Sequence, residues 1–160
     1  MNFDLAFERL LGLEGGYVND PRDAGGETKY GISRRSYPGE MIRTMTLDRA
    51  KEIYLRDYWG PAGCDAVPDA IKYDLFDMAV HSGVITAIKT LQRTVGVGDD
   101  GKLGPITLQA VASMPALRFV ARFNGARLQF MSALPTWPSF GRGWANRIAK
   151  TCWRFEDEPF

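Results

Sequence analysis

Residues 13–33 of the chain read LEGGYVNDPRDAGGETKYGIS. Residues 3–11 come before them, and their phenylalanines and leucines recur at the spacing of an amphipathic helix. The glycine pairs and the Asn-Asp-Pro sequence within 13–33 are typical of turns. We therefore expect a first helix that is ended by the glycine pair at 15–16. A small irregular hairpin should follow, in which residues 17–18 and 29–32 pair as short strands.

Helical periodicity dominates the rest of the chain and is interrupted by proline and glycine. Thr46 is a suitable N-cap residue, and Pro68 and Pro105 suit the beginnings of two further helices. The pair Trp137-Pro138 should separate the last two helices. The predicted helices cover residues 47–58, 68–82, 85–95, 105–113, 116–134 and 144–155. The expected fold class is therefore mainly α, with one small β-hairpin near the N-terminus.

Several of these helices have a clear apolar face, which should point toward the core. The positions on these faces include Leu47, Ala50, Ile53, Tyr54 and Tyr58 in 47–58, Ile71, Leu75, Met78 and Ala79 in 68–82, and Ile85, Ile88, Leu91 and Val95 in 85–95.

The length and charge of the chain limit the number of domains and the classes of binding partner that we expect. Its 160 residues suffice for one compact domain or for two small lobes that share a core. Lys and Arg number 20 and Asp and Glu number 19, a balance that argues against binding to nucleic acid. The N-terminus lacks the pattern of a signal peptide, and no apolar run reaches the roughly 20 residues of a membrane span. We expect a soluble protein that is made in the cytoplasm.

Cysteine and histidine are too few for a metal site of the usual kinds. Cys64 and Cys152 lie far apart without the spacing of metal ligands, so both are predicted to be free thiols. His81 is the only histidine, which excludes a zinc site built on several histidines. The sequence therefore implies no metal and no cofactor.

Glu14 is the candidate acid of the opening stretch. At the expected C-terminus of the first helix, the macrodipole disfavours a nearby anion by roughly 0.3–1 kcal/mol. The apolar surfaces of Leu13 and Tyr17 would add desolvation, so both effects raise the pKa of the Glu14 carboxyl. A general acid that protonates a glycosidic oxygen near neutral pH needs such a shift. The alternative is a solvated glutamate at a frayed helix end.

Asp23 and Thr28 are the residues that could work with this acid. A hairpin over residues 17–32 folds back toward the helix end, so all three side chains can face one cleft. Glycoside hydrolysis generally uses a second acidic or polar group to place water or to stabilise positive charge on the sugar. The alternative is that Asp20 and Asp23 cap turns and that Thr28 is an ordinary strand residue.

The order and spacing of these residues resemble the signature of glycoside hydrolase family 108. The residues that carry the resemblance are Glu14-Gly15-Gly16-Tyr17, Asn19-Asp20-Pro21, Asp23, Gly25-Gly26, Thr28 and Tyr30-Gly31-Ile32-Ser33. The resemblance implies a lysozyme-like fold and the activity of the muramidases found as phage endolysins and bacterial wall hydrolases, some of which are called secretion activators. It also implies that Glu14 is the catalytic acid. The roles of Asp23 and Thr28 follow from the similar Glu–Asp–Thr triad of phage-type lysozymes, which has one residue more before the threonine.

The second half resembles the predicted peptidoglycan-binding region that accompanies this catalytic region. The matching residues are 77–83, 91–92, 100–105 and Thr107. The family often has asparagine where this chain has His81. The resemblance implies a catalytic region over 1–90 and a helical, predicted peptidoglycan-binding region over 91–160, packed as one globular unit. Alternatively, residues 100–107 are simply a loop followed by a capped helix.

Aromatic side chains are candidates for sugar contacts, because aromatic faces stack on sugar rings. Tyr30, Tyr58 and Trp59 are the residues that we assign to substrate binding. Aromatic residues at helical spacing are more often part of the core, and this alternative applies to each of them.

Together these observations predict a lysozyme that cleaves β-1,4 bonds between N-acetylmuramic acid and N-acetylglucosamine in bacterial peptidoglycan, acting as an endolysin. A lytic transglycosylase and a non-catalytic murein-binding or secretion-helper protein are the alternatives. We expect a monomer that acts on the wall, in the periplasm, after release through a holin or an export system. Neither nucleic acid nor stable membrane insertion is expected.

Overall fold

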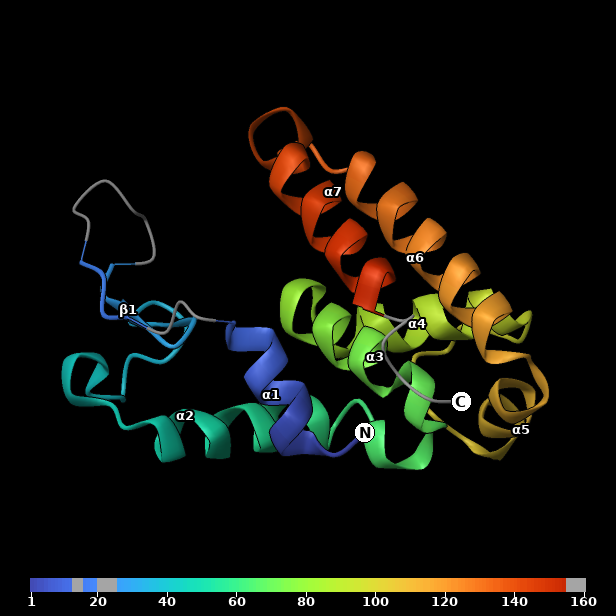
Figure 1. The fold of residues 1–160 in the computed structure, drawn as a ribbon, viewed down its shortest axis with the longest axis horizontal. Helices are drawn as coiled ribbons and strands as arrows, with labels where there is room; N and C mark the ends of the chain where they lie inside the picture. Colours follow the sequence, from blue (N-terminus) through green and yellow to red (C-terminus); the bar gives the residue numbers. More distant parts are fainter. Residues whose placement is uncertain (13–15, 20–25, 155–160) are drawn as a thin grey trace. The chain divides into compact units, whose positions relative to one another are not determined.

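The computed structural model describes residues 1–12, 16–19 and 26–154 (Figure 1). These residues contain seven α-helices, several short 3-10 and π-helical turns, and one two-stranded antiparallel hairpin, which confirms the mainly α prediction. The chain divides into two compact units. The N-terminal unit is Asn2–Asp57, and the helical unit is Met1 together with Tyr58–Phe160. The functional division predicted between residues 90 and 91 stays a prediction.

The first helix is shorter than the sequence suggested. Helix α1 (Phe3–Leu11) begins where the Asn2 side chain accepts a hydrogen bond from the Leu5 amide, and it ends at Gly12, whose φ is 58°. The prediction that the glycine pair at 15–16 ends this helix is therefore wrong, because an earlier glycine already takes the positive φ that terminates it. Glu14 and both Asp20 and Asp23 lie outside the described residues.

The hairpin consists of β1 (Thr28–Lys29) and β2 (Ile32–Ser33), with Thr28 opposite Ser33. Tyr30 and Gly31 form the turn with φ values of 51° and 76°, the signs that a two-residue type I′ turn requires. Val18 pairs with Thr28 on the other side of β1. A small hairpin near the N-terminus is thus confirmed, but its pairing differs from the prediction. Its strands are residues 28–29 and 32–33, Val18 pairs with Thr28 and not with a residue of 29–32, and Tyr30 and Gly31 belong to the turn.

Helix α2 completes the N-terminal unit. After the short turn η1 (Ile42–Thr44), α2 (Leu47–Tyr54) begins at Thr46, whose hydroxyl accepts a hydrogen bond from the Arg49 amide, as predicted for an N-cap. The π-helical turn η2 (Leu55–Trp59) follows. The apolar core of this unit includes Phe7, Ile32, Ile42, Ala50, Ile53 and Tyr54. Leu47, in contrast, is exposed, so it does not belong to the buried face that the sequence predicted for this helix.

In its described residues, the helical unit contains five α-helices and one short 3-10 turn. Its elements are η3 (Cys64–Ala66), α3 (Asp69–Ser82), α4 (Val84–Val95), α5 (Pro105–Ser113), α6 (Ala116–Ser132) and α7 (Trp137–Arg154). Helix α3 contacts both α4 and α6, and α6 and α7 lie side by side (Figure 1). The core includes Ile71, Leu75, Phe76, Met78, Leu91, Phe119, Phe123 and Met131. No helix among the described residues is long and apolar enough to cross a membrane.

Helix α7 begins earlier than predicted. Trp137-Pro138 does not separate two helices but forms the first turn of α7. Amide groups in the first turn have no partner within the helix, so the missing N–H of proline costs nothing there. The predicted beginnings at Pro68 and Pro105 are confirmed.

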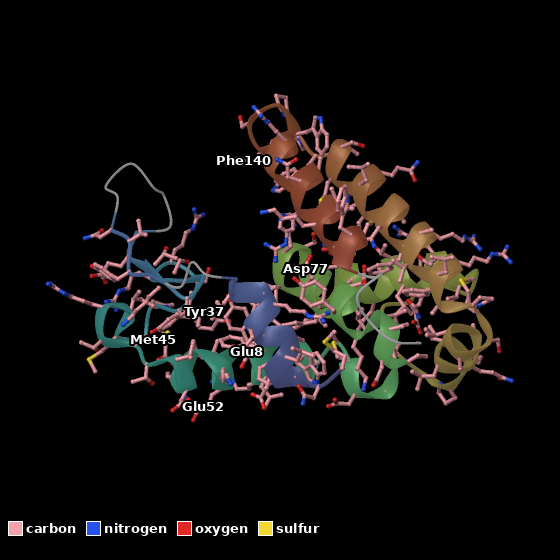
Figure 2. All side chains as sticks on the ribbon, in the orientation of Figure 1. Glu8, Tyr37, Met45, Glu52, Asp77 and Phe140 are labelled. Carbon is pink, nitrogen blue, oxygen red and sulfur yellow. The ribbon has the colours of Figure 1, made fainter. Side chains whose placement is uncertain are left out.

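Charged groups lie inside the helical unit. Asp77, on α3, accepts hydrogen bonds from Arg147 of α7 at 2.6 and 2.9 Å and from Arg127 of α6 (Figure 2). Asp74, one turn earlier, accepts a hydrogen bond from the Asn124 amide at 2.6 Å. The two arginines around Asp77 keep the pKa of its carboxyl below the ordinary range despite burial. Their ion pairs with Asp77 connect α6 and α7 to α3.

Cys64 and Cys152 are free thiols, as predicted. Cys64 is buried, and burial raises the pKa of its thiol to about 12.

Candidate functional site

Thr28 is the predicted catalytic residue that the structure describes. It is half-buried in β1, and its hydroxyl donates to the Gly26 carbonyl at 3.4 Å. Its backbone amide and carbonyl both pair with Val18 at 2.8 Å. Thr28 is therefore a strand residue, as the simpler interpretation held, but its hydroxyl oxygen can still accept a hydrogen bond from water. A catalytic role for Thr28 stays a prediction.

The pairing of Val18 with Thr28 also fixes the two ends of one segment. In the sequence, residues 19–27 lie between them and include Asp23. The Arg34 amide donates to the Glu27 carbonyl at 2.8 Å, which adds a third backbone bond at this base. The ends of the segment that carries Asp23 are thereby held by a hydrogen-bonded ladder.

Glu27 is engaged on both sides of its carboxylate. The Tyr17 hydroxyl donates to Oε1 at 2.8 Å, and Arg34 donates to Oε2 at 2.8 Å through Nη2. Hydrogen bonds from Arg34 and Tyr17 lower the pKa of Glu27, and the same carboxylate raises the pKa of Tyr17. A carboxyl that is held ionised is a poor proton donor near neutral pH. Glu27 is therefore unsuited to the role that we assign to Glu14.

Ion pairs and one hydrogen bond to a backbone carbonyl connect the hairpin to α2. Arg34 donates to the Glu40 carbonyl at 2.6 Å through Nη1. The Glu40 carboxylate pairs with Arg49 at 2.6 Å, which lowers the pKa of Glu40, and Arg49 also reaches Glu52, labelled on α2 in Figure 2. Exposed ion pairs contribute little stability one by one, but a network in one geometry fixes orientation. The hairpin is thus set in place against α2.

Tyr30 is held by its backbone in the turn. Its carbonyl accepts a hydrogen bond from the Tyr54 hydroxyl at 3.1 Å, and the Lys29 ammonium lies 5.3 Å from the centre of its ring. A Cβ on the neighbouring Gly31 would lie 2.5 Å from the Tyr54 hydroxyl, so the turn requires glycine there both for space and for its φ. The Tyr30 ring is half-buried, and sugar contact by it stays a prediction.

Trp59 corrects one of the substrate-binding assignments. Its side chain is 1% exposed and lies edge-on to Phe76, with ring centres 5.4 Å apart. A ring enclosed in this way is not available to stack on a sugar, so Trp59 belongs to the core. Tyr58 is half-buried and stays a candidate.

Gln92 explains much of the motif in the second half of the chain. Its side chain, 1% exposed, donates to the Asp100 carboxylate at 2.7 Å and to the Lys102 carbonyl at 3.0 Å, and it accepts from the Gly101 amide at 2.9 Å. It also contacts the Thr107 hydroxyl at 3.2 Å. These bonds hold the loop before α5 and favour the interpretation of residues 100–107 as a loop followed by a helix.

His81 lies near the end of α3 and is half-buried. Its Nδ1 is 3.1 Å from the Ser82 hydroxyl, and its ring meets Trp144 edge-on at 5.5 Å. Burial, followed by the charge of Arg147, lowers the pKa of His81. No group of three or more potential metal ligands occurs among the residues that the structure describes.

Comparison with known proteins gives the chain a family. The model of the family described as Glycosyl hydrolase 108 matches residues 7–83. The solved structure of SagA from Brucella abortus is 34% identical in sequence, with a TM-score of 0.87, over 97% of this chain and 94% of SagA. The chain belongs to the glycosyl hydrolase 108 family. Among curated proteins, no significant match was found.

Membership in the glycosyl hydrolase 108 family makes the chain a glycoside hydrolase and supports peptidoglycan hydrolysis in general. The matched range contains Glu14, Asp23 and Thr28 and ends at Gly83, directly after α3. The similarity to SagA extends over almost the whole chain, so the fold of both units is shared with that protein.

Proposed function

We propose that this glycoside hydrolase is a muramidase, which cleaves the β-1,4 bond between N-acetylmuramic acid and N-acetylglucosamine in bacterial peptidoglycan. The observation that carries the proposal is the glycosyl hydrolase 108 match over residues 7–83, since this range includes the whole ordered motif from Glu14 to Ser33.

In the proposed reaction Glu14 donates a proton to the glycosidic oxygen, and the bond from that oxygen to the anomeric carbon breaks. Asp23 stabilises the positive charge that develops on the sugar or orients the water that adds to it. Thr28 accepts a hydrogen bond from this water, and the proton that the water loses as it bonds to the anomeric carbon passes to the Asp23 or the Glu14 carboxylate. The hydrogen bonds from Arg34 and Tyr17 to Glu27 support this assignment of roles, because they make Glu27, the other glutamate of residues 13–33, a poor proton donor.

We further propose the setting in which this activity operates. The enzyme is a monomeric endolysin that is made in the cytoplasm. It reaches the wall, in the periplasm, through a holin or an export system, and its macromolecular partner is peptidoglycan itself. The helical region over 91–160 contributes to binding this substrate.

The test is mass spectrometry of purified murein digested by the wild type and by Glu14→Gln. The proposal expects fragments with reducing N-acetylmuramic acid ends from the wild type and at least a hundredfold slower release from the variant, a loss on the order of what general acid catalysis supplies. Anhydromuramic ends would indicate a lytic transglycosylase. If both proteins bind murein and neither releases fragments, the binding or secretion-helper role replaces the proposal.

A further inference from the structure

A cavity of about 400 Å³ lies between α4 and α6 of the helical unit. Its lining residues are Thr90, Arg93 and Thr94 of α4, and Arg122, Ala126, Gln129 and Phe130 of α6. Positions 90 and 94, like 122, 126 and 130, are spaced by four residues, so each helix contributes one continuous face. Cavities of about 300–1,000 Å³ are typical of small-ligand sites.

The floor of this cavity offers acceptors and apolar contacts. Thr90 and Thr94 are 4% exposed, and their hydroxyls donate to carbonyls of their own helix at 2.9 and 2.8 Å. Each hydroxyl proton is therefore used, while the oxygen can still accept a hydrogen bond from a ligand N–H. Ala126 and Phe130 are half-buried and supply apolar surface beside these oxygens.

The rim carries positive charge. Arg93 pairs with Asp99, which largely offsets its charge. Arg122 is exposed and has no ion-pair partner among the described residues. Gln129, also exposed, adds an amide to the same rim. The cavity thus combines one uncompensated guanidinium with acceptors for N–H groups and an apolar wall.

We infer that this cavity binds a short carboxylate-bearing peptide, and specifically the stem peptide of a murein strand. A guanidinium pairs well with a carboxylate, the threonine oxygens accept from peptide amides, and small side chains fit against Ala126 and Phe130. The inference rests on the proposed function, because murein is the substrate that carries such peptides. It adds a peptide subsite to an enzyme that acts on the sugar chain.

The test uses two probes, a disaccharide-tetrapeptide muropeptide and the same disaccharide without peptide. Both are titrated into full-length protein with Glu14→Gln, which prevents turnover, and are followed by amide NMR shifts and calorimetry. The muropeptide should shift signals of residues around Thr94 and Ala126, and the disaccharide should not. Arg122→Gln should weaken muropeptide binding about tenfold, the loss expected for one charge-assisted pair.

Arg118→Gln is the matched control, because Arg118 is an exposed arginine one turn earlier on α6 that does not line the cavity. It should change muropeptide binding less than about twofold. The inference is overturned if both variants weaken muropeptide binding equally. It is also overturned if the disaccharide shifts the amide signals as much as the muropeptide does, or if neither probe shifts signals of residues at the cavity. Binding is measured without bond cleavage, so an enzyme that cleaves murein but leaves the cavity empty refutes only the peptide subsite. A protein that binds the muropeptide in the cavity but cleaves no murein refutes only the proposed function.

Discussion

The buried carboxyl of Asp74 predicts an unusual dependence of stability on pH. Asp74 is 4% exposed and has Asn124 as its hydrogen-bonding partner. Burial raises the pKa of Asp74 from the ordinary value of 3.8 to about 6, although the Asn124 bond and the charge of Arg127 oppose the shift. In the unfolded chain the side chain is solvated and regains its ordinary pKa.

The sign of the effect follows from proton binding. Between about pH 4 and pH 6 the folded protein binds more protons at Asp74 than the unfolded chain does, so the free energy of unfolding falls as the pH rises. At about 1.4 kcal/mol for each pKa unit, the full loss is about 3 kcal/mol and is complete above about pH 6. Asp74→Asn keeps the acceptor for Asn124 but cannot ionise, so it avoids this loss.

Chemical denaturation from pH 4 to pH 8 checks this prediction. The free energies of unfolding of the wild type and Asp74→Asn should be similar near pH 4, and the variant should become about 3 kcal/mol more stable by pH 8. Asp65→Asn, which changes an exposed aspartate of the same unit, should show no such divergence. A difference in stability that is constant with pH, or a variant that is less stable than the wild type at pH 8, would show that burial does not raise the pKa of Asp74.

Three further predictions concern the hairpin and the loop before α5. Glu27→Gln should lower the rate of murein cleavage several-fold and reduce the melting temperature, because it removes the anion that pairs with Arg34 in the hairpin. Glu52→Gln, at the exposed end of the same network of ion pairs, should change neither the rate nor the melting temperature. Gly31→Ala should lower the free energy of unfolding, measured by chemical denaturation, by about 1–2 kcal/mol, because the φ of Gly31 is positive and a Cβ would collide with the Tyr54 hydroxyl. Gly39→Ala should be nearly neutral, because a Cβ at Gly39 would meet open space. Gln92→Leu should lower the free energy of unfolding by about 2–4 kcal/mol, because it leaves the buried Gly101 amide without its acceptor and the buried Thr107 hydroxyl without its donor; a variant as stable as the wild type would contradict this role.

Local signals in the sequence predicted most of the fold. Pro105 begins α5 and Thr46 caps α2, since caps and first turns depend on a few neighbouring residues. Local signals did not decide the structure where two residues or two roles were equally suitable. Gly12 ends α1 before the glycine pair at 15–16 can do so, and Pro138 fits a first turn as well as a break.

The candidate site was predicted less completely, for a different reason. The hairpin around Thr28 could be predicted from turn residues. The hydrogen bonds to Glu27 come from Arg34 and Tyr17, seven and ten positions away in the sequence, and only the register of the hairpin shows that these side chains meet. Trp59 was predicted wrongly for a related reason. A tryptophan at a helix end can line a sugar groove or belong to the core, and the sequence does not tell which until the neighbours of the ring are known. Burial is a property of the tertiary structure that spacing alone does not carry.

In the proposed function, Glu14 drives addition of water at the anomeric carbon of N-acetylmuramic acid. Digestion of murein in water labelled with heavy oxygen, followed by mass spectrometry of the fragments, tests it most directly. We expect one heavy oxygen at each new reducing N-acetylmuramic acid end with the wild type, and almost no labelled product with Glu14→Gln. Unlabelled anhydromuramic ends, label on N-acetylglucosamine ends, or equal labelling by Glu14→Gln would contradict it.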